Sequence, residues 1–503
     1  MTSPRTDAPK TRSATPGGSV RTGAQYIEAI RNDGRHVVHD GEVIRDVTSH
    51  PAFRGAVRSV ARLWDIAADP TEREVMTFPS PKTSAPVLRC YQIPRSAADL
   101  SARRKMSERW AEATFGLIGR APDHVAGFLA GFAAKPGFFA AAGKAFAENV
   151  TRFYERARDE HLYVSYAIVP PQIDRSKPAH QQSDPTLYAG VVKERDDGIV
   201  LKGAQQLATG AALSDYIYIS CIHPLQPGDE AYAFGAVLPI TTPGLKIYTR
   251  RSYATAATSS FDYPLSSRFD ETDALLVLDN AFVPWENVFF HHNIELCRDQ
   301  WWKTPSHLYG NHQAQARYAT KLRFLLGLTK RLCEITGVDR IPPGQIQLGE
   351  MAAYATIVED MIVAGEAQAT TDERGIVWPS RTALYAVMAL QSELNPKIID
   401  IARELSGGSM VMLPSSVKDF ETPASAADLE RYVQSPGYAA RERIALLKMA
   451  WDLIGTEFAG RHQQYEKFYG GASFLIKQNM YRSYDFGRAK ALVDGLLDLP
   501  PTA

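Results

Sequence analysis

The amino-acid sequence predicts an α+β protein in which a mainly helical part comes first, a β-rich part follows, and a helical bundle comes last. Apolar residues recur at three- and four-residue spacing before about residue 160 and after about residue 296, which is typical of helices. Between these regions lie short runs of β-forming residues separated by Gly and Pro turns. Helices and strands that do not alternate along the chain exclude a doubly wound sheet.

The composition of the chain argues against several classes of protein. The 56 Lys and Arg residues balance the 56 Asp and Glu residues, which argues against a nucleic-acid-binding protein. The most apolar region, 125–147, is interrupted by Lys135 and Pro136, so no membrane span is predicted. Four cysteines lie far apart without a Cys-x-x-Cys motif, which indicates neither a disulfide framework nor a zinc or iron–sulfur site. A reduced, cytoplasmic location fits this pattern.

The first part of the chain has clear local signals. Residues 1–19 are rich in Pro, Thr, Ser and Arg and lack the apolar core of a secretory signal, so we expect a disordered tail. Thr22 and Gln25 form a capping box at the start of a short helix. Asp40-Gly41 between β-formers predicts a hairpin. Helical patterns then cover 97–118 and 125–157, so we expect a mainly helical domain over 20–160.

The middle of the chain, 161–295, is predicted to be an antiparallel, β-barrel-like domain. The strand candidates are 188–194, 198–202, 216–221, 231–240, 245–249 and 274–279. The hydroxyl-rich stretch 252–271 suits a loop beside this β core, because Ser and Thr bond to their own backbone. Such a loop is either a ligand site or an ordinary sheet edge, and the residues alone do not decide between these interpretations.

The last part, 296–503, is predicted to be a helical bundle. The expected helices are 313–334, 345–369, 380–391, 395–406 and 440–465. No Gly-x-Gly-x-x-Gly follows a strand, so a nicotinamide-binding Rossmann site is not predicted.

Six motifs, spread in order over roughly residues 20–470, carry a resemblance to a known family. They are Asp46-Val-Thr-Ser-His-Pro-Ala-Phe53, Gly119-Arg-Ala-Pro-Asp123, Ala167-Ile-Val-Pro-Pro-Gln-Ile-Asp-Arg175, Asp262-Tyr-Pro-Leu-Ser-Ser-Arg-Phe-Asp-Glu271, Val283-Pro-Trp-Glu-Asn-Val288 and Gly455-Thr-Glu-Phe-Ala-Gly-Arg-His462. Together they closely resemble the two-component, flavin-dependent aromatic monooxygenases typified by the oxygenase component of 4-hydroxyphenylacetate 3-monooxygenase. The resemblance implies an acyl-CoA dehydrogenase-like fold and a homotetramer.

The resemblance also implies the chemistry. In this family a separate NAD(P)H:flavin reductase supplies reduced flavin, usually FADH2 with FMNH2 as the alternative. The oxygenase lets the reduced flavin react with O2, and a flavin-4a-hydroperoxide hydroxylates a phenolic or other activated aromatic substrate, ortho to its hydroxyl group. The cofactor carries the hard chemistry and the protein orients it and excludes water. The alternative is an acyl-CoA dehydrogenase or dehydratase acting on a CoA thioester, which needs an acidic base that nothing in the bundle singles out. A non-catalytic scaffold is a third interpretation.

The resemblance places the catalytic roles on Arg120, His124 and Tyr166. A fixed positive charge at Arg120 can stabilise reduced flavin or a phenolate-like transition state, whereas the alternative is a surface arginine at a helix end. The 4-hydroxyphenylacetate enzymes have Tyr where this chain has His124 and His where it has Tyr166. We therefore expect His124 to be the base that activates the phenol and Tyr166 to donate a hydrogen bond. The alternative is that both are packing residues.

The resemblance also implies the binding residues, for each of which a turn or capping role is the structural alternative. Those expected to bind the flavin are Tyr166, Ala167, Ile168, Gln172, Ile173, Asp174, Arg175, Thr209, Gly455, Thr456, Glu457 and Phe458. Those expected to bind the substrate are Arg120, His124, Cys221 and Ile222. The counterpart of Cys221-Ile222 is polar in enzymes that hold a carboxylate-bearing phenol, so this apolar pair favours an uncharged phenol or a larger aromatic. His291-His292 lies near Glu295 and Cys297, but without a further His or Cys pair we predict no metal site.

Overall fold

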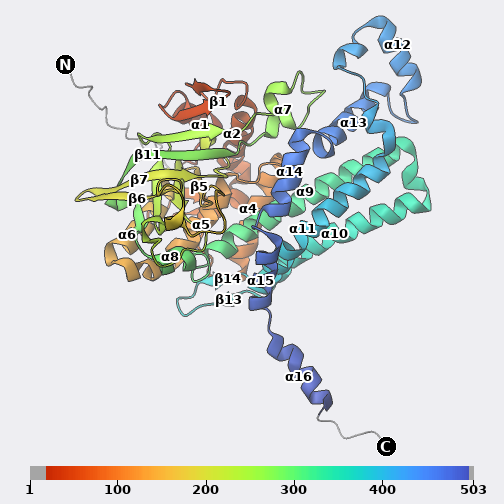
Figure 1. Ribbon diagram of the computed structural model, residues 1–503. Helices are drawn as coiled ribbons and strands as arrows, with labels where there is room; N and C mark the ends of the chain where they lie inside the picture. Colours follow the sequence, from red (N-terminus) through yellow and green to blue (C-terminus); the bar gives the residue numbers. More distant parts are fainter. Residues whose placement is uncertain (1–18, 498–503) are drawn as a thin grey trace, which may run out of the picture.

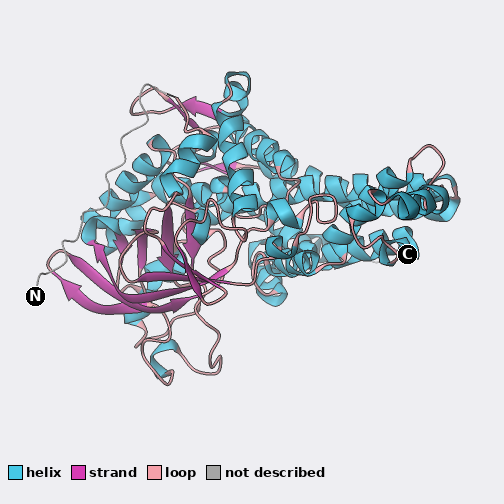
Figure 2. Cartoon of the chain, turned by 90° about the horizontal axis from the view of Figure 1, so that it is seen from above, coloured by secondary structure: helices cyan, strands magenta, loops and turns pink. Residues whose placement is uncertain are grey.

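The computed structural model describes residues 19–497, and the predicted α+β order of helices, strands and helices is confirmed (Figure 1). The expected disordered tail lies, apart from Ser19, outside the described residues. In Figure 2 the strands gather at one end of the molecule, and the long helices extend away from them. The expected domain limits near residues 160 and 296 stay predictions.

The regular elements follow the three parts of the chain. The first part contains α1 (Gly23–Ile30), β1 (His36–His39), β2 (Glu42–Ile44), α2 (Arg54–Ala68), α3 (Arg73–Met76), β3 (Thr77–Pro79), β4 (Pro86–Leu88), α4 (Ala97–Ala113), α5 (Pro122–Ala134) and α6 (Lys144–Asp159). The middle part contains β5 (Val164–Ala167), β6 (Gly190–Arg195), β7 (Gly198–Gln205), β8 (Tyr216–Ser220), β9 (Gly235–Pro239), β10 (Leu245–Thr249), α7 (Ser266–Phe269), β11 (Ala274–Pro284), β12 (Val288–Phe290) and α8 (Ile294–Asp299). The last part contains α9 (Ser306–Thr336), α10 (Pro342–Ala367), β13 (Thr370–Thr371), β14 (Val377–Trp378), α11 (Arg381–Ser406), α12 (Pro423–Tyr432), α13 (Ala440–Ile454), α14 (Glu457–Phe468), α15 (Ser473–Ser483) and α16 (Phe486–Leu497).

The local signals of the first part are confirmed. Thr22 caps α1, because its hydroxyl accepts from the Gln25 amide while the Gln25 side chain accepts from the Thr22 amide. Asp40 and Gly41 both have positive φ, at 52° and 80°, which is the backbone that a tight two-residue hairpin between β1 and β2 requires.

The strands form two main sheets that are mixed, so the prediction of a wholly antiparallel domain is wrong. One sheet has six strands in the order β2-β1-β10-β11-β7-β6, and the other has four in the order β12-β9-β8-β5. The pairs β1–β10 and β5–β8 are parallel. The β1–β2 hairpin from the first part of the chain thus extends the sheet of the middle part. Its partner strand is about two hundred residues away, and no local pattern encodes that pairing.

Helices α5 and α9 approach closely, and this contact positions the site described below. A Cβ atom on Gly131 would lie 2.2 Å from the Cα of Ser306, and one on Gly127 would lie 3.2 Å from the backbone of Tyr309. Glycine is therefore required at Gly131 for the two backbones to meet. The middle and the end of α5 are in this way held against the start of α9.

Two helix boundaries in the bundle differ from the prediction. The expected break at 391–395 is absent, because α11 continues through Pro396. Pro396 itself lies on the exposed face of the helix. Conversely, the expected single helix 440–465 is broken at Gly455-Thr456, because the Thr456 hydroxyl accepts from the Ala459 amide and starts α14 as a new helix.

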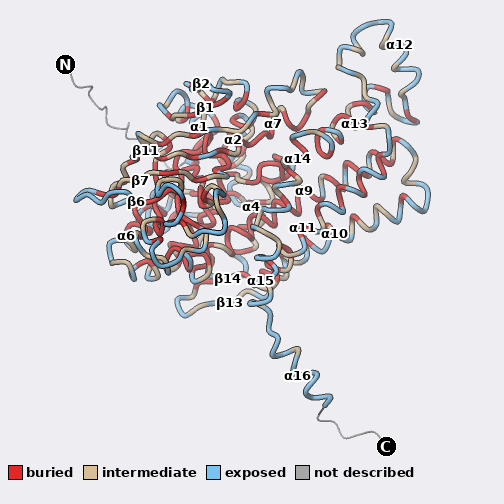
Figure 3. Tube along the Cα trace, in the orientation of Figure 1, coloured by how far each residue is buried: buried red, intermediate tan, exposed pale blue. Residues whose placement is uncertain are grey.

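The last helix projects from the body of the molecule. Figure 1 shows α16 extending away from the bundle, and Figure 3 shows it exposed along its length. Its side chains include the exposed apolar residues Leu492, Val493, Leu496 and Leu497. Within residues 19–497 no single helix is long and apolar enough to cross a membrane. Only α5 together with 136–142, a pair bent by 72°, passes on length and composition.

Candidate active site

Arg120 lies in the short loop before α5, surrounded by aromatic rings. Its guanidinium carbon is 5.2, 5.3 and 5.2 Å from the ring centroids of Tyr166, Tyr465 and Tyr469, respectively. Its amide donates to Glu271 at 2.9 Å, and its carbonyl accepts from the hydroxyl of Tyr163 at 2.6 Å. Arg120 is thus clamped at the junction of the helical and β parts, and it is not the surface arginine of the alternative interpretation.

His124, in the first turn of α5, is fixed in one tautomer by its neighbours. Arg120 Nη1 lies 2.5 Å from His124 Nε2, and because arginine only donates, Nε2 must accept. The proton is therefore on Nδ1, which lies 2.9 Å from Gln313 Oε1 on α9. Gln313 in turn donates from Nε2 to Asp123 Oδ1 at 3.0 Å. An Arg–His–Gln–Asp chain of hydrogen bonds results.

Burial and charge set the protonation of this chain. Burial, together with the neighbouring Arg120, holds the pKa of His124 well below its usual range. Burial also raises the pKa of Asp123 to about 6, although its hydrogen bonds and Arg103 act in the opposite direction. At neutral pH the imidazole is therefore neutral, with its one lone pair directed at Arg120.

Tyr166, on β5, completes the predicted catalytic group. Its ring centroid is 5.7 Å from that of His124 and 5.7 Å from that of Phe128. The structure therefore brings Arg120, His124 and Tyr166 together from two segments of the chain, the start of α5 and β5.

Thr209, expected to contact the flavin ring, joins the same region through two carboxylates. Its hydroxyl donates to Asp273 at 2.7 Å, and Asp273 also accepts from Arg461 on α14 at 2.6 and 2.9 Å. Arg461 reaches Glu271 at 3.0 Å, the carboxylate that holds the Arg120 amide. Burial lowers the pKa of Arg461, but the carboxylates of Asp273 and Glu271 more than offset this effect and hold the pKa well above its usual range. Arg461 stays charged.

The segment 455–458 lies at the start of α14, one turn before Arg461. Thr456 caps the helix, so its side chain has the structural role named as the alternative. Gly455 and Glu457 are exposed, and Glu457 pairs with Arg251 at 3.4 Å. Phe458 is buried against His462, with ring centroids 4.4 Å apart.

The remaining predicted residues extend from β5 in two directions. Ala167 is the last residue of β5, and the carbonyl of Ile168 accepts from the Ile222 amide at 2.8 Å, which places Cys221-Ile222 beside it. Cys221 is buried, whereas Ile222 is half exposed. Residues 172–175 form a largely exposed segment. The Asp174 side chain accepts from Ser176, so its contacts are local.

Several residues of the site were not predicted from the sequence. They are Gln313, Tyr465 and Tyr469, together with the carboxylate and arginine set Glu271, Asp273 and Arg461. Glu271 and Arg461 lie inside the quoted motifs. A charged residue within a motif that had no assigned role was the signal that could have identified them. Gln313 and the two tyrosines lie in helical stretches where nothing distinguishes them from packing residues.

The site has the chemistry to hold a planar, anionic cofactor and a phenol. The buried hydroxyl of Tyr465 has no hydrogen-bond partner among the described residues, yet it lies against Arg120 and would touch a Cβ on Gly119. A buried polar group without a partner is costly, so a ligand atom is the natural complement to it. Arginine surrounded by tyrosine rings also suits a flat, negatively charged ring system.

Comparison with known proteins identifies the chain. Profiles described as 4-hydroxyphenylacetate 3-hydroxylase N terminal and C terminal match residues 22–290 and 297–498. The oxygenase component of 4-hydroxyphenylacetate 3-monooxygenase from Thermus thermophilus is 35% identical over 92% of this chain and 95% of its own. The oxygenase component of Rhodococcus 4-nitrophenol 2-monooxygenase is 35% identical over 94% of this chain and 90% of its own.

Solved structures agree with this relationship. A crystal structure of the oxygenase component of 4-hydroxyphenylacetate 3-monooxygenase, complexed with FAD and 4-hydroxyphenylacetate, matches with a TM-score of 0.90 at 34% identity. It covers 95% of this chain and 98% of that one. An archaeal 4-hydroxybutyryl-CoA dehydratase from N. maritimus, at 22% identity and a TM-score of 0.87, shares the fold alone. The fold and the site define an enzyme of the flavin-dependent monooxygenase class. More specifically, the chain belongs to the 4-hydroxyphenylacetate 3-hydroxylase family.

Proposed function

We propose that this protein is the oxygenase component of a two-component monooxygenase that hydroxylates a phenolic substrate, ortho to its hydroxyl group, with O2 and reduced FAD. The observation that carries the proposal is the Arg120–His124–Gln313 chain, which ends beside Tyr166 and the unpaired hydroxyl of Tyr465. The helical–β–helical fold and the full-length similarity to oxygenase components support it. Cytoplasmic location fits four buried, free cysteines.

Reduced FAD, when bound, supplies the activation of O2 and the oxygen atom that is transferred. We assign the phenol proton to His124, whose Nε2 is unprotonated, and the resulting negative charge on the substrate oxygen to Arg120. Arg120 gives up its hydrogen bond to Nε2 when it turns to that oxygen. Gln313 keeps the proton on Nδ1 and so keeps Nε2 free to act. Tyr166 would donate a hydrogen bond to the bound flavin or to the substrate.

The flavin is assigned to 166–168, 172–175, Thr209 and 455–458, with FMN as the alternative cofactor. We infer that a separate NAD(P)H:flavin reductase delivers it, since no nicotinamide-binding motif follows a strand. A homotetramer is inferred from the family resemblance, and the exposed apolar side chains of α15 and α16 are available for subunit contacts.

A CoA-thioester dehydrogenase would need a free acidic base in the bundle, but the buried Glu466 is engaged by Arg317, Lys321 and Gln391.

The first test supplies the purified protein with reduced FAD, O2 and a panel of phenols. We expect reduced FAD to bind in an anaerobic titration. With a generic NADH:flavin reductase, we expect hydroxylated product to form in proportion to NADH consumed. Because Cys221-Ile222 is apolar, 4-methylphenol should give more coupled product than 4-hydroxyphenylacetate. A strong preference for the acid would overturn the substrate assignment, and no product from any phenol would overturn the function.

The second test addresses His124 as the base. His124→Gln is expected to lower coupled hydroxylation by about 10²- to 10⁴-fold, the usual contribution of a positioned base. Because the pKa of His124 is lowered, the neutral, competent form persists as the pH falls below about 6.5. The rate with pre-reduced FAD should therefore show no loss near pH 6.5 in the unsubstituted enzyme. Unchanged coupling in His124→Gln, or a loss near pH 6.5 that the variant abolishes, would contradict this role.

A further inference from the structure

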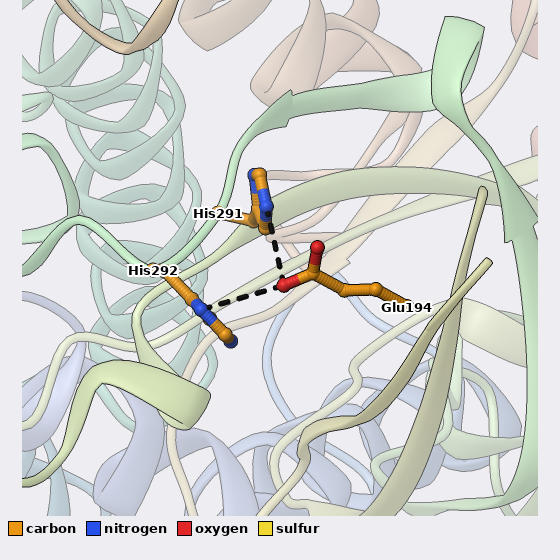
Figure 4. Close-up of side chains that lie close together, drawn as sticks. All are labelled: Glu194, His291 and His292. Carbon is orange, nitrogen blue, oxygen red and sulfur yellow. Dashed lines mark ion pairs between the residues drawn. The ribbon is translucent and has the colours of Figure 1, made fainter. Parts of the chain in front are cut away.

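A second cluster of ligand-type side chains lies apart from the proposed active site. Glu194 is on β6, and His291 and His292 follow β12 directly (Figure 4). The three side chains are 47%, 20% and 43% exposed, respectively, so a dissolved ion can reach them. From the sequence the two histidines were considered only with Glu295 and Cys297. The structure supplies Glu194 instead, from a strand far away along the chain.

The distances in this cluster fit a shared cation better than direct hydrogen bonds. His291 Nε2 and His292 Nδ1 lie 3.6 and 3.5 Å from the same Glu194 oxygen, Oε1. Both separations are longer than a good hydrogen bond. A tetrahedral zinc ion with bonds of about 2.0 to 2.2 Å places neighbouring donor atoms about 3.4 Å apart. The three donor atoms all lie within 4.8 Å of one another.

The backbone conformation and the surrounding aromatic rings direct the two histidine side chains towards one common point. Successive side chains of an extended chain point to opposite faces, but His292 has a left-handed backbone with φ 51°. The two rings consequently turn to the same side, with centroids 5.2 Å apart, as Figure 4 shows. The His291 ring is held edge-on against Trp285 at 5.0 Å and beside Phe146 at 5.6 Å. One donor is thus fixed and the two others need only small adjustments.

We propose that Glu194, His291 and His292 form a zinc-binding site, with water as the fourth ligand. Two imidazoles and one carboxylate are a common ligand set for this ion. Cys297 takes no part, because its buried thiol donates to the carbonyl of Cys221 at 3.2 Å.

The position of the site indicates what the ion does. β6 is an edge strand of the six-stranded sheet, and β12 is an edge strand of the four-stranded sheet. An ion held by Glu194 and the two histidines would therefore tie the edges of the two sheets together. Zinc bound to the folded but not to the unfolded chain raises the temperature of unfolding by mass action. The site is a structural clamp, separate from the hydroxylation chemistry.

The test is a calorimetric titration of untagged, chelator-treated, full-length protein with zinc chloride. We expect one saturable zinc ion per chain and a rise in the unfolding temperature on zinc addition. Glu194→Gln and His292→Ala should each weaken binding at least tenfold and remove that rise. Both positions are exposed, so the variants should fold, which circular dichroism checks. Glu295→Gln, a nearby exposed carboxylate outside the cluster, is the control and should bind as the unsubstituted protein does.

Two outcomes would overturn the proposal. One is the absence of saturable zinc binding to the unsubstituted protein. The other is binding of equal strength in Glu194→Gln, His292→Ala and the Glu295→Gln control, which would place the ion elsewhere on the molecule.

Discussion

Replacing Arg120 by glutamine is expected to lower coupled hydroxylation by about 10²- to 10³-fold, the cost of losing one preorganised group that stabilises developing charge. Arg120 is the fixed cation that faces His124 and three tyrosine rings, and glutamine keeps hydrogen-bonding capacity without the charge. The measurement is product formed per NADH consumed, together with the affinity for reduced FAD. Uncoupled consumption of NADH should persist, because the reductase is a separate protein.

Two further variants make the Arg120 result interpretable. Arg120→Lys keeps the charge but loses the planar fork that contacts His124, so we expect an intermediate loss. Arg109→Gln removes a partly buried arginine on α4 that pairs with Glu72 and is not one of the site residues, so it should leave coupling unchanged. Full coupled activity in Arg120→Gln would exclude the charge-stabilising role.

Glu466→Ala is expected to give the largest loss of stability, about 3 to 5 kcal/mol, because it leaves two buried cations without the carboxylate that balances their charge. Glu466 is completely buried in α14 and accepts from Arg317, from Lys321 at 2.8 Å and from Gln391 at 2.7 Å. The midpoint of urea unfolding at fixed protein concentration measures the change. Glu393→Ala, which removes the exposed partner of Lys477, is the control and should not shift the midpoint measurably.

The Glu466 carboxylate also predicts how the stability of the protein changes as the pH falls. Burial raises the pKa of Glu466, but Arg317 and Lys321 more than offset this effect and lower the pKa to about 2. A group whose pKa is lowered by folding stabilises the native state above its unfolded pKa, near 4.5, and that stability is lost as the pH falls towards 2. Glu466→Gln should therefore lose less stability than the unsubstituted protein between about pH 4.5 and pH 2. An unchanged acid profile would contradict this reasoning.

Features with short-range causes could be predicted from the sequence. The Thr22–Gln25 capping box and the Asp40-Gly41 hairpin each depend on a few neighbouring residues, and both are present. The motifs placed Arg120 and His124 in one site, and the structure brings these residues together. The helix break expected between residues 391 and 395 was wrong, because α11 continues from Arg381 to Ser406 with Pro396 inside it.

Features that depend on distant partners could not be predicted. Gln313 fixes the tautomer of His124 from 189 residues away, and its own helix carries no mark of that role. The parallel pairing of β1 with β10 likewise joins segments that are about two hundred residues apart in the chain. Glu194 is the same kind of case, since a carboxylate on an edge strand is unremarkable until His291 and His292 fold beside it.

Arg461 has a practical consequence for protein engineering. It crosses from α14 to Asp273 and Glu271, and those two carboxylates hold Thr209 and the Arg120 amide. A chimera in which a relative supplies the C-terminal bundle would therefore combine the arginine of one parent with the two carboxylates of the other. Crossover points placed before Glu271 keep these partners in one parent. Libraries recombined between Asp273 and Arg461 should yield far fewer working hybrids.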